Sequence, residues 1–263
     1  MPKAVEVFGT GPGRAVALHC SLARASAWAP LGARLGDLLT IHAPDLPGHG
    51  DAAPWSPEAV YHDQALAIVA DAVGEGPVDL LGHSYGAVLA LAFAVANPSR
   101  VRSLILYEPV LFAAIADGDP AVTGQLADHM GRVEALRAQG DCHGAAQLFT
   151  QVWGGAQSWD NIPAQQQQYL ADRIHLIHAG RALLYDDAGG VLVPGALARV
   201  TAPCLLLNGD HSPPSVAAIQ KVLAKGLPNA QRAVVKGGAH MAPITRSAAV
   251  AELVRPFLEM RPL

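Results

Sequence analysis

The chain has 263 residues, of which 51% are apolar and 15% are charged, and its formal net charge at pH 7 is −4. A chain of this length can bury about three-quarters of its unfolded surface, so it needs no disulfide or metal in order to fold. Its mild acidity and scattered basic residues exclude the binding of nucleic-acid phosphates as its main function. Sparse charge together with plentiful aliphatic residues also excludes an intrinsically disordered chain.

The cysteines and the apolar runs favour a cytoplasmic protein. Cys20, Cys142 and Cys204 lie far apart and are odd in number, which is typical of reduced thiols rather than of a disulfide framework. The first residues show no basic segment followed by an apolar stretch, so we expect no secretory signal. The longest apolar run, Ala87–Ala96, is about half a membrane span and predicts a buried helix. We expect no membrane insertion, and the oligomeric state is left open.

Short apolar runs alternate along the chain with longer segments of helical spacing. This alternation predicts an α/β fold with a mainly parallel sheet and helices on both of its faces. The expected strands are Ala4–Phe8, Ala15–His19, Thr40–Ala43, Val78–Leu81, Val101–Tyr107, Cys204–Asn208 and Arg232–Val235. The expected helices are Ala27–Leu39, Val60–Val73, Tyr85–Asn97, Val216–Ala224 and Ser247–Met260.

The alternation stops between about Leu111 and Gly195, where convincing strand runs are missing. Three segments there have helical character: Ala121–Gln139, Gly144–Trp153 and Ala164–Tyr185. An insertion of about 80 residues between two strands is too long for a plain crossover. We therefore expect a helical cap, or lid, of residues 113–194 on a core made of residues 1–112 and 195–263.

The strongest motif lies between the expected strand Val78–Leu81 and the helix that begins at Tyr85. Its sequence, Gly-His-Ser-Tyr-Gly, places Ser84 at the centre of the pattern G-x-S-x-G, which is typical of a nucleophile held on a sharp strand-to-helix turn. Small residues two before and two after the serine let the strand and the helix approach each other. A chance match is the alternative in a glycine-rich chain, but the flanking strand and helix favour Ser84 as a nucleophile.

With this motif the sequence resembles the α/β-hydrolase family, in its soluble branch with a lid. The residues that support the resemblance extend along nearly the whole chain: Leu18-His19, Trp28, Asp45 to Gly50 (DLPGHG), the Ser84 motif, and Gly238-Ala239-His240-Met241. It implies a cap inserted after the strand that corresponds to the sixth of the family. It also implies that His240, on the loop after the last strand, is the base that activates Ser84. Of the other histidines near the sheet edge, His83 is expected to point away, and His19 and His49 to shape the pocket.

Two carboxylates are candidates for the acid that orients His240. The family usually places it three residues beyond a glycine after the penultimate strand, where this chain has Ser212. Asp210 lies in the same loop but two residues earlier. Some members instead have the acid after the strand that follows the nucleophile helix, and there this chain has Glu108. Either group could accept the histidine N–H; we prefer Glu108 and keep Asp210 as the alternative.

Acyl transfer also needs hydrogen-bond donors for the oxyanion that develops on the substrate. One expected donor is the backbone N–H of Tyr85, directly after the nucleophile. The resemblance places the second in the loop after the strand Ala15–His19, and by matching position we assign it to Ser21. Cys20 stands where the family commonly has glycine, and we expect it to be a small buried filler.

These residues predict a hydrolase that uses neither cofactor nor metal and acts on a small, largely apolar substrate. Ser84 would cleave a carboxylic ester, thioester or lactone through an acyl-enzyme. A serine at this position argues against the dehalogenase and epoxide hydrolase branches, which use aspartate there. Hydrolysis of a carbon–carbon bond, acyl transfer to an acceptor other than water, and a non-catalytic ligand-binding protein of this fold are the alternatives. Tryptophans could line the pocket, although they are more often core residues.

Overall fold

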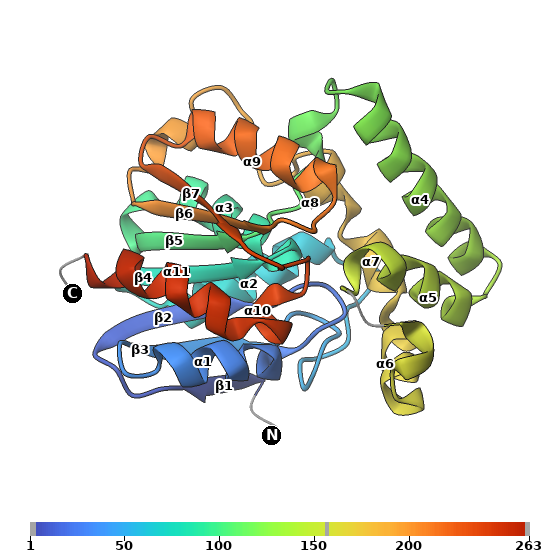
Figure 1. The fold of residues 1–263 in the computed structure, drawn as a ribbon, viewed down its shortest axis with the longest axis horizontal. Coiled ribbons are helices and arrows are strands. Elements are labelled where there is room, and N and C mark those ends of the chain that lie inside the picture. The colour runs from blue at the N-terminus through green and yellow to red at the C-terminus, as the bar shows by residue number, and fades with distance from the viewer. Residues whose placement is uncertain (1–3, 156–157, 261–263) are drawn as a thin grey trace.

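The computed structural model describes residues 4–155 and 158–260. Its centre is a seven-stranded sheet with the strand order β1-β3-β2-β4-β5-β6-β7 (Figure 1). Only β1 is antiparallel to its neighbour β3, and all other pairs are parallel. The predicted mostly parallel sheet is therefore confirmed. The strands are β1 (Val5–Phe8), β2 (Gly13–Leu18), β3 (Leu39–Pro44), β4 (Val78–His83), β5 (Val101–Tyr107), β6 (Cys204–Gly209) and β7 (Ala230–Val235).

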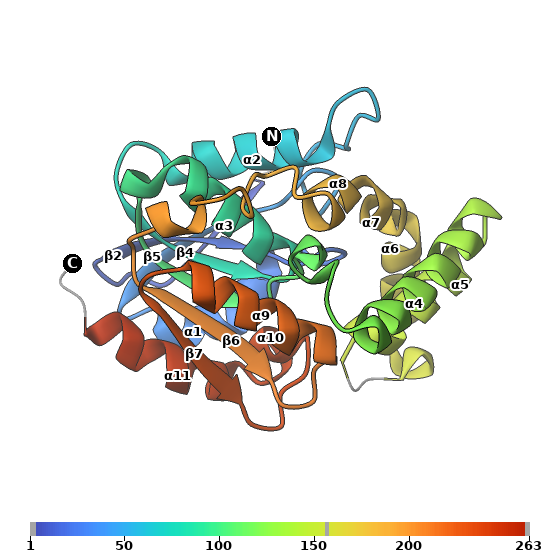
Figure 2. The ribbon, with the colours of Figure 1, turned by 90° about the horizontal axis from the view of Figure 1, so that it is seen from above.

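Helices cover both faces of the sheet, as Figure 2 shows from above. They are α1 (Ala29–Leu35), α2 (Tyr61–Val73), α3 (Tyr85–Ala96), α4 (Pro120–Ala138), α5 (Cys142–Trp153), α6 (Ala164–Arg173), α7 (His175–Ala179), α8 (Arg181–Tyr185), α9 (Pro214–Gly226), α10 (Ala242–Thr245) and α11 (Ser247–Glu259). Successive strand residues point to opposite faces. Leu80 thus packs in the cluster that contains α2, α3 and α9, and Leu81 in the cluster that contains α1 and α11. In the described ranges, none of the helices is both long and apolar enough to cross a bilayer.

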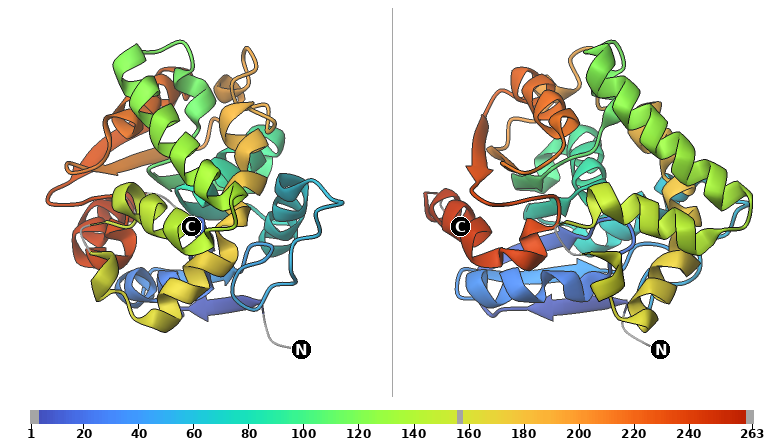
Figure 3. Two further views of the ribbon diagram at one scale, coloured as in Figure 1. Left: turned by 90° about the vertical axis from the view of Figure 1, so that its right-hand side faces the viewer. Right: turned by 45° about the vertical axis from the view of Figure 1, so that its right-hand side comes forward.

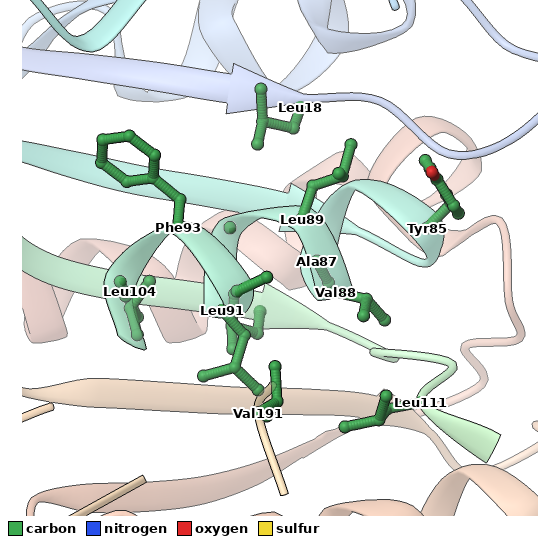
Figure 4. Packing of buried hydrophobic residues seen from close by; sticks show 14 of the residues in the cluster. Leu18, Tyr85, Ala87, Val88, Leu89, Leu91, Phe93, Leu104, Leu111 and Val191 are labelled. Atoms are coloured by element: carbon green, nitrogen blue, oxygen red, sulfur yellow. The ribbon is translucent and has the colours of Figure 1, made fainter. Parts of the chain in front are cut away.

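The helix α3 lies at the centre of the larger of these clusters. Its residues from Tyr85 to Val95 are all buried, and Figure 4 shows Leu89 and Leu91 packed among side chains from the sheet and from distant segments. The predicted buried helix is therefore present, and it begins directly after Ser84. Because α3 is enclosed on every side, the turn that holds Ser84 cannot shift without repacking the core.

The chain between β5 and β6 forms the helices α4 to α8, called here the inserted helices. They lie beyond the end of the sheet toward which β4 and β5 point (Figures 1 and 3). The sequence predicts one helix over Ala164–Tyr185, but the structure has three short ones that meet at Ile174 and Gly180. Gly180 lies against the Tyr85 ring, where a Cβ would come within 2.9 Å of Cε2. The bend at Gly180 thus places the inserted helices against Tyr85, at the start of α3.

The first predicted helix, Ala27–Leu39, is also shorter than expected. A 3-10 turn, Ala25–Trp28, precedes α1, which ends at Leu35, and Leu39 already belongs to β3. The Gly36 carbonyl accepts hydrogen bonds from the amides of Thr10 and Gly11. The loop between β1 and β2 thus makes hydrogen bonds to the backbone directly after α1. Helical spacing in the sequence does not reveal this long-range contact.

Candidate active site

Ser84 occupies the sharp turn between β4 and α3. Its backbone has φ 57° and ψ −115°, which is rare for a residue with a side chain. A Cβ at Gly82 would lie 2.5 Å from Ala87 Cα, and one at Gly86 would lie 2.2 Å from the Leu18 carbonyl oxygen. Strand β4 and helix α3 therefore approach too closely for a side chain at Gly82, and α3 and the end of β2 approach too closely for one at Gly86.

Strained backbone is concentrated around this turn. Four non-glycine residues among those described have positive φ. Two of them, Ser84 (57°) and Glu108 (48°), directly follow β4 and β5, and Leu22 (63°) lies in the loop after β2. Conformations of this kind cost free energy and are found mainly at functional sites. The strained residues thus mark one edge of the sheet.

His240 and Glu108 are joined by a short hydrogen bond in the interior. The Nδ1 of His240 lies 2.7 Å from Oε2 of Glu108, and the two residues are 3% and 0% exposed. The other oxygen of Glu108 accepts hydrogen bonds from the amide of Gly209, at 2.8 Å, and from the Ser212 hydroxyl. Burial by itself would raise the pKa of Glu108, but the hydrogen bonds from these three donors and the electrostatic interaction with the His240 ring lower it. The carboxylate is therefore held ionised.

The two candidate acids are thus placed very differently. Asp210 is exposed, and backbone hydrogen bonding, chiefly at Gly237, lowers its pKa. Among the described residues, it is Glu108 and not Asp210 that contacts the His240 ring. Ser212, at the position where the family usually has its acid, donates a hydrogen bond to Glu108 instead.

Two residues outside the predicted site, Tyr107 and His83, make hydrogen bonds to the loop that contains His240. The Tyr107 hydroxyl donates to the Ala239 carbonyl at 2.8 Å. His83 Nε2 lies 2.7 Å from the His240 carbonyl, to which it donates. Burial holds the pKa of His83 well below its usual value. The sequence predicts that His83 points away from the nucleophile, and in the structure its ring centre lies 5.1 Å from that of His240.

Ser84 and His240 share a neighbour, Trp153. The centre of the Trp153 ring lies 4.8 Å from that of His240, and Trp153 also lines a cavity together with Ser84. Within the described ranges no hydrogen bond joins the Ser84 hydroxyl to His240. Such contacts are often long in structures without substrate. His240 therefore contacts Glu108 directly. Its contact with Trp153 places it beside the cavity that Ser84 lines.

The loop that contains Ser21 is held by two buried histidines. His49 Nε2 accepts a hydrogen bond from the Leu22 amide at 3.0 Å, and His19 Nε2 accepts one from the Leu46 amide at 3.0 Å. The backbone N–H groups of Ser21 and Tyr85 donate no hydrogen bond to any residue that the structure describes. They are the two amides that the sequence analysis selects as oxyanion donors.

Cys20, next to Ser21, is buried at 3% exposure. Burial raises the pKa of its thiol to about 12, so the side chain stays protonated at neutral pH. A protonated, enclosed thiol is a poor nucleophile, which agrees with the expected role of Cys20 as a filler.

The buried histidines predict that stability depends on pH. Burial lowers the pKa of His19, and burial together with the charge of His19 lowers that of His49 further. The unfolded chain therefore binds more protons than the folded one below about pH 6.5. The contribution of the neutral His19 and His49 rings to stability is complete above that pH. It is lost as the pH falls toward the lowered pKa values of the two folded-state rings.

We expect the free energy of unfolding, measured with urea between pH 5 and 8, to fall below about pH 6.5. His49→Gln, whose amide oxygen can still accept from Leu22, should flatten this slope. The exposed His143→Gln should not change it. An unchanged slope in His49→Gln would contradict the assignment.

Two cavities meet at the candidate site. The inner cavity has a volume of about 30 Å³ and is lined by Ser84 and by apolar side chains from the core and the inserted helices. The outer cleft has a volume of about 370 Å³ and lies between α5, α6 and the loops after β2 and β7. Both are lined by Ser21, Phe149 and Trp153. Among the described residues, no cluster of potential metal ligands is found.

Tyr169 of α6 connects the wall of the outer cleft to two loops of the core. Its hydroxyl donates to the Ala23 carbonyl at 3.0 Å and accepts from the Gly50 amide at 3.2 Å. The guanidinium carbons of Arg24 and Arg173 lie 4.5 and 3.7 Å from the centre of its ring. One side chain thus attaches an inserted helix to the Ser21 loop.

Comparison with known proteins assigns the chain to a family. The model of the alpha/beta hydrolase family matches residues 15–253. The chain is similar to the lipase LipV of Mycobacterium tuberculosis, with 38% identity over 111 residues, which are 41% of each protein. It is also similar to the pimeloyl-[acyl-carrier protein] methyl ester esterase of Neisseria meningitidis, with 29% identity over 227 residues and 86% of both chains covered.

Solved structures agree with this assignment. An alpha/beta hydrolase from Sphaerobacter thermophilus superposes with a TM-score of 0.72 and 25% identity, covering 97% of this chain and 95% of that one. Other similar proteins are a poly(3-hydroxyalkanoate) depolymerase of Ectopseudomonas oleovorans and a 2-hydroxy-6-oxononadienedioate/2-hydroxy-6-oxononatrienedioate hydrolase of Cupriavidus pinatubonensis. With a family model matched over most of its length and a fold shared with solved members, this chain belongs to the alpha/beta hydrolase family.

Proposed function

We propose that this protein is a serine hydrolase that cleaves a carboxylic ester or thioester through an acyl-enzyme. The main support is the buried hydrogen bond between His240 and Glu108, on loops at the sheet edge where Ser84 is held in a strained turn. Relatives named as a lipase and as a methyl ester esterase support the same class of substrate.

In the first half of the proposed reaction, the Ser84 oxygen attacks the substrate carbonyl carbon, and its proton passes to Nε2 of His240. Glu108 accepts the Nδ1–H, so the ring presents Nε2 as a base, and the carboxylate stabilises the imidazolium that forms. The tetrahedral oxyanion accepts hydrogen bonds from the amides of Tyr85 and Ser21. The intermediate collapses to an acyl-enzyme, and the leaving alkoxide or thiolate takes the proton from His240.

In the second half, His240 removes a proton from water, which attacks the acyl-enzyme carbonyl. The second tetrahedral intermediate expels the Ser84 oxygen, which recovers its proton from His240, and the carboxylic acid is released. The bonds of His83 and Tyr107 to the His240 loop hold the ring in place over both steps. The inserted helices act as a lid, because α5 and α6 form one wall of the outer cleft.

A fluorophosphonate probe tests this proposal directly. We expect the folded protein to be labelled on the peptide that contains Ser84, located by digestion and mass spectrometry, and to hydrolyse p-nitrophenyl acetate. Heat-denatured protein is the control and should not react. Absence of labelling in the folded protein would favour a ligand-binding protein. Labelling without hydrolysis of any ester or thioester would favour carbon–carbon bond cleavage or acyl transfer.

A further inference from the structure

A single charged side chain lines the outer cleft. Of the described residues around this space of about 370 Å³, only Arg24 carries a charge, and none supplies a carboxylate. The rest of the lining is apolar or consists of neutral polar residues such as Ser26, Thr150 and Gln166. A cation in a cleft without a balancing negative charge favours a ligand that supplies one.

Arg24 is exposed and has no ion-pair partner in the part of the chain that the structure describes. Its guanidinium donates no hydrogen bond to any of the described residues either. The Asp45 carboxylate lies in a neighbouring loop, but it accepts from the amides of Ala25 and Asp51, at 2.7 and 2.8 Å. The charge of Arg24 is therefore available to a bound molecule.

Tyr169 restricts the position of this guanidinium. The Arg24 Cζ lies 4.5 Å from the centre of the Tyr169 ring, and the hydroxyl of the same residue is fixed by its hydrogen bonds to the backbone at Ala23 and Gly50. A cation–π contact orders the side chain without occupying a hydrogen-bond acceptor, so the N–H donors stay free. Their planar arrangement suits a carboxylate, which can accept two parallel hydrogen bonds.

The larger part of a substrate must lie in the outer cleft. The inner cavity, which Ser84 lines, has a volume of about 30 Å³ and holds about two water-sized groups. Ser21 lines both spaces. Arg24 follows Ser21 by three residues, so their Cα atoms are at most about 11 Å apart. A group at Arg24 can thus belong to the same molecule whose carbonyl carbon is attacked by Ser84.

Resting on the proposed function, we infer that the substrate is an ester or thioester whose larger part carries a carboxylate, and that Arg24 binds this carboxylate in the outer cleft. One unpaired positive charge matches a monoanion better than a phosphate, whose charge at pH 7 is about −1.5 to −2. The smaller part of the substrate, of about the size of a methyl group, lies toward the inner cavity. Arg24 is thus a specificity-determining residue.

Two pairs of esters that differ only in charge test this inference. Monomethyl adipate and its amide have the variable group on the acyl part, whereas 4-acetoxybutanoate and its amide have it on the alcohol part. Hydrolysis is followed by acid release in a pH-stat at pH 7 and low salt. We expect kcat/KM to be about tenfold higher for the carboxylate in one of the pairs, chiefly through a lower KM. The ratio should fall as NaCl is added, and the pair that shows it identifies the part in the cleft.

Variants locate the preference. Arg24→Gln should bring the ratio between carboxylate and amide close to one, and Arg24→Lys, which keeps the charge but not the planar fork, should retain part of it. Arg173→Gln is the matched control, because the Arg173 Cζ lies 3.7 Å from the centre of the same Tyr169 ring but Arg173 does not line the cleft. Its ratio should stay within about twofold of that of the wild type. Thermal unfolding curves check that each variant is folded, and the salt dependence of the wild type gives a second readout.

The possible failures are distinguishable. A wild-type protein that hydrolyses p-nitrophenyl acetate but prefers the carboxylate in neither pair overturns the inference and leaves the serine hydrolase intact. A preference that survives in Arg24→Gln, or that is lost equally in Arg173→Gln, also overturns it. A protein that hydrolyses none of the esters and is not labelled by the fluorophosphonate probe contradicts the proposed function itself.

Discussion

Replacement of Ser84 by alanine is expected to lower kcat for ester hydrolysis by a factor of about 10⁴ to 10⁶ and to abolish labelling by a fluorophosphonate. In the proposed mechanism the hydroxyl forms the acyl-enzyme, and no neighbouring residue can replace it. The backbone strain at φ 57° belongs to the turn and not to the hydroxyl, so the variant should fold. Steady-state kinetics on p-nitrophenyl acetate, together with a thermal unfolding curve, measures both effects.

A buried serine elsewhere provides the control for this variant. Ser103 is 0% exposed, and its hydroxyl donates to Asp79 at 2.6 Å, near the opposite end of β5 from Glu108. Ser103→Ala should lower stability while kcat stays close to that of the wild type. Retention of more than a tenth of the wild-type kcat by Ser84→Ala would be incompatible with its role as nucleophile.

The Glu108→Gln variant is expected to lower kcat by a factor of about 10⁴. The substitution keeps the size of the side chain, but the amide has only one acceptor oxygen. Three donors, from His240, Gly209 and Ser212, compete for it. An amide N–H facing His240 would force the ring into the tautomer whose Nε2 carries the hydrogen and cannot act as a base.

Asp210→Asn is the matched comparison, because Asp210 was the alternative acid and is exposed. We expect its kcat to lie within about threefold of the wild type, since surface substitutions usually change little. The two variants should be measured on the same ester at the same pH. A large loss in Asp210→Asn together with a small one in Glu108→Gln would reverse the assignment of the acid.

The sheet could be predicted from the sequence because its central strands are covered on both faces. A strand such as β6 is buried throughout, and its residues Cys204 to Leu207 form a continuous apolar run. The turn at Ser84 was also readable, since Gly82 is required by its close contact with Ala87 within one short segment, although Gly86 is required by the distant end of β2. Local sequence thus contains the information for local steric constraints.

The remaining features depend on contacts between distant parts of the chain. His83 donates to His240 across a separation of 157 residues, and Gly180 meets the Tyr85 ring. Neither pair leaves a periodic pattern. The choice between Glu108 and Asp210 likewise required coordinates, because both follow strands at the same edge and only the direction of the side chain separates them. One available signal was Ser212, a hydroxyl in place of the family's usual acid.

The attachment of Tyr169 has a consequence for how substrate could reach the site. Its hydroxyl binds the backbone at Ala23 and Gly50. Any movement of α6 away from these core loops would therefore break both hydrogen bonds. The segment released at Ala23 is the same one that presents the Ser21 amide. In the proposed reaction, α6 therefore stays in place while the Ser21 amide binds the oxyanion, because displacement of this helix would disturb the loop that carries the donor.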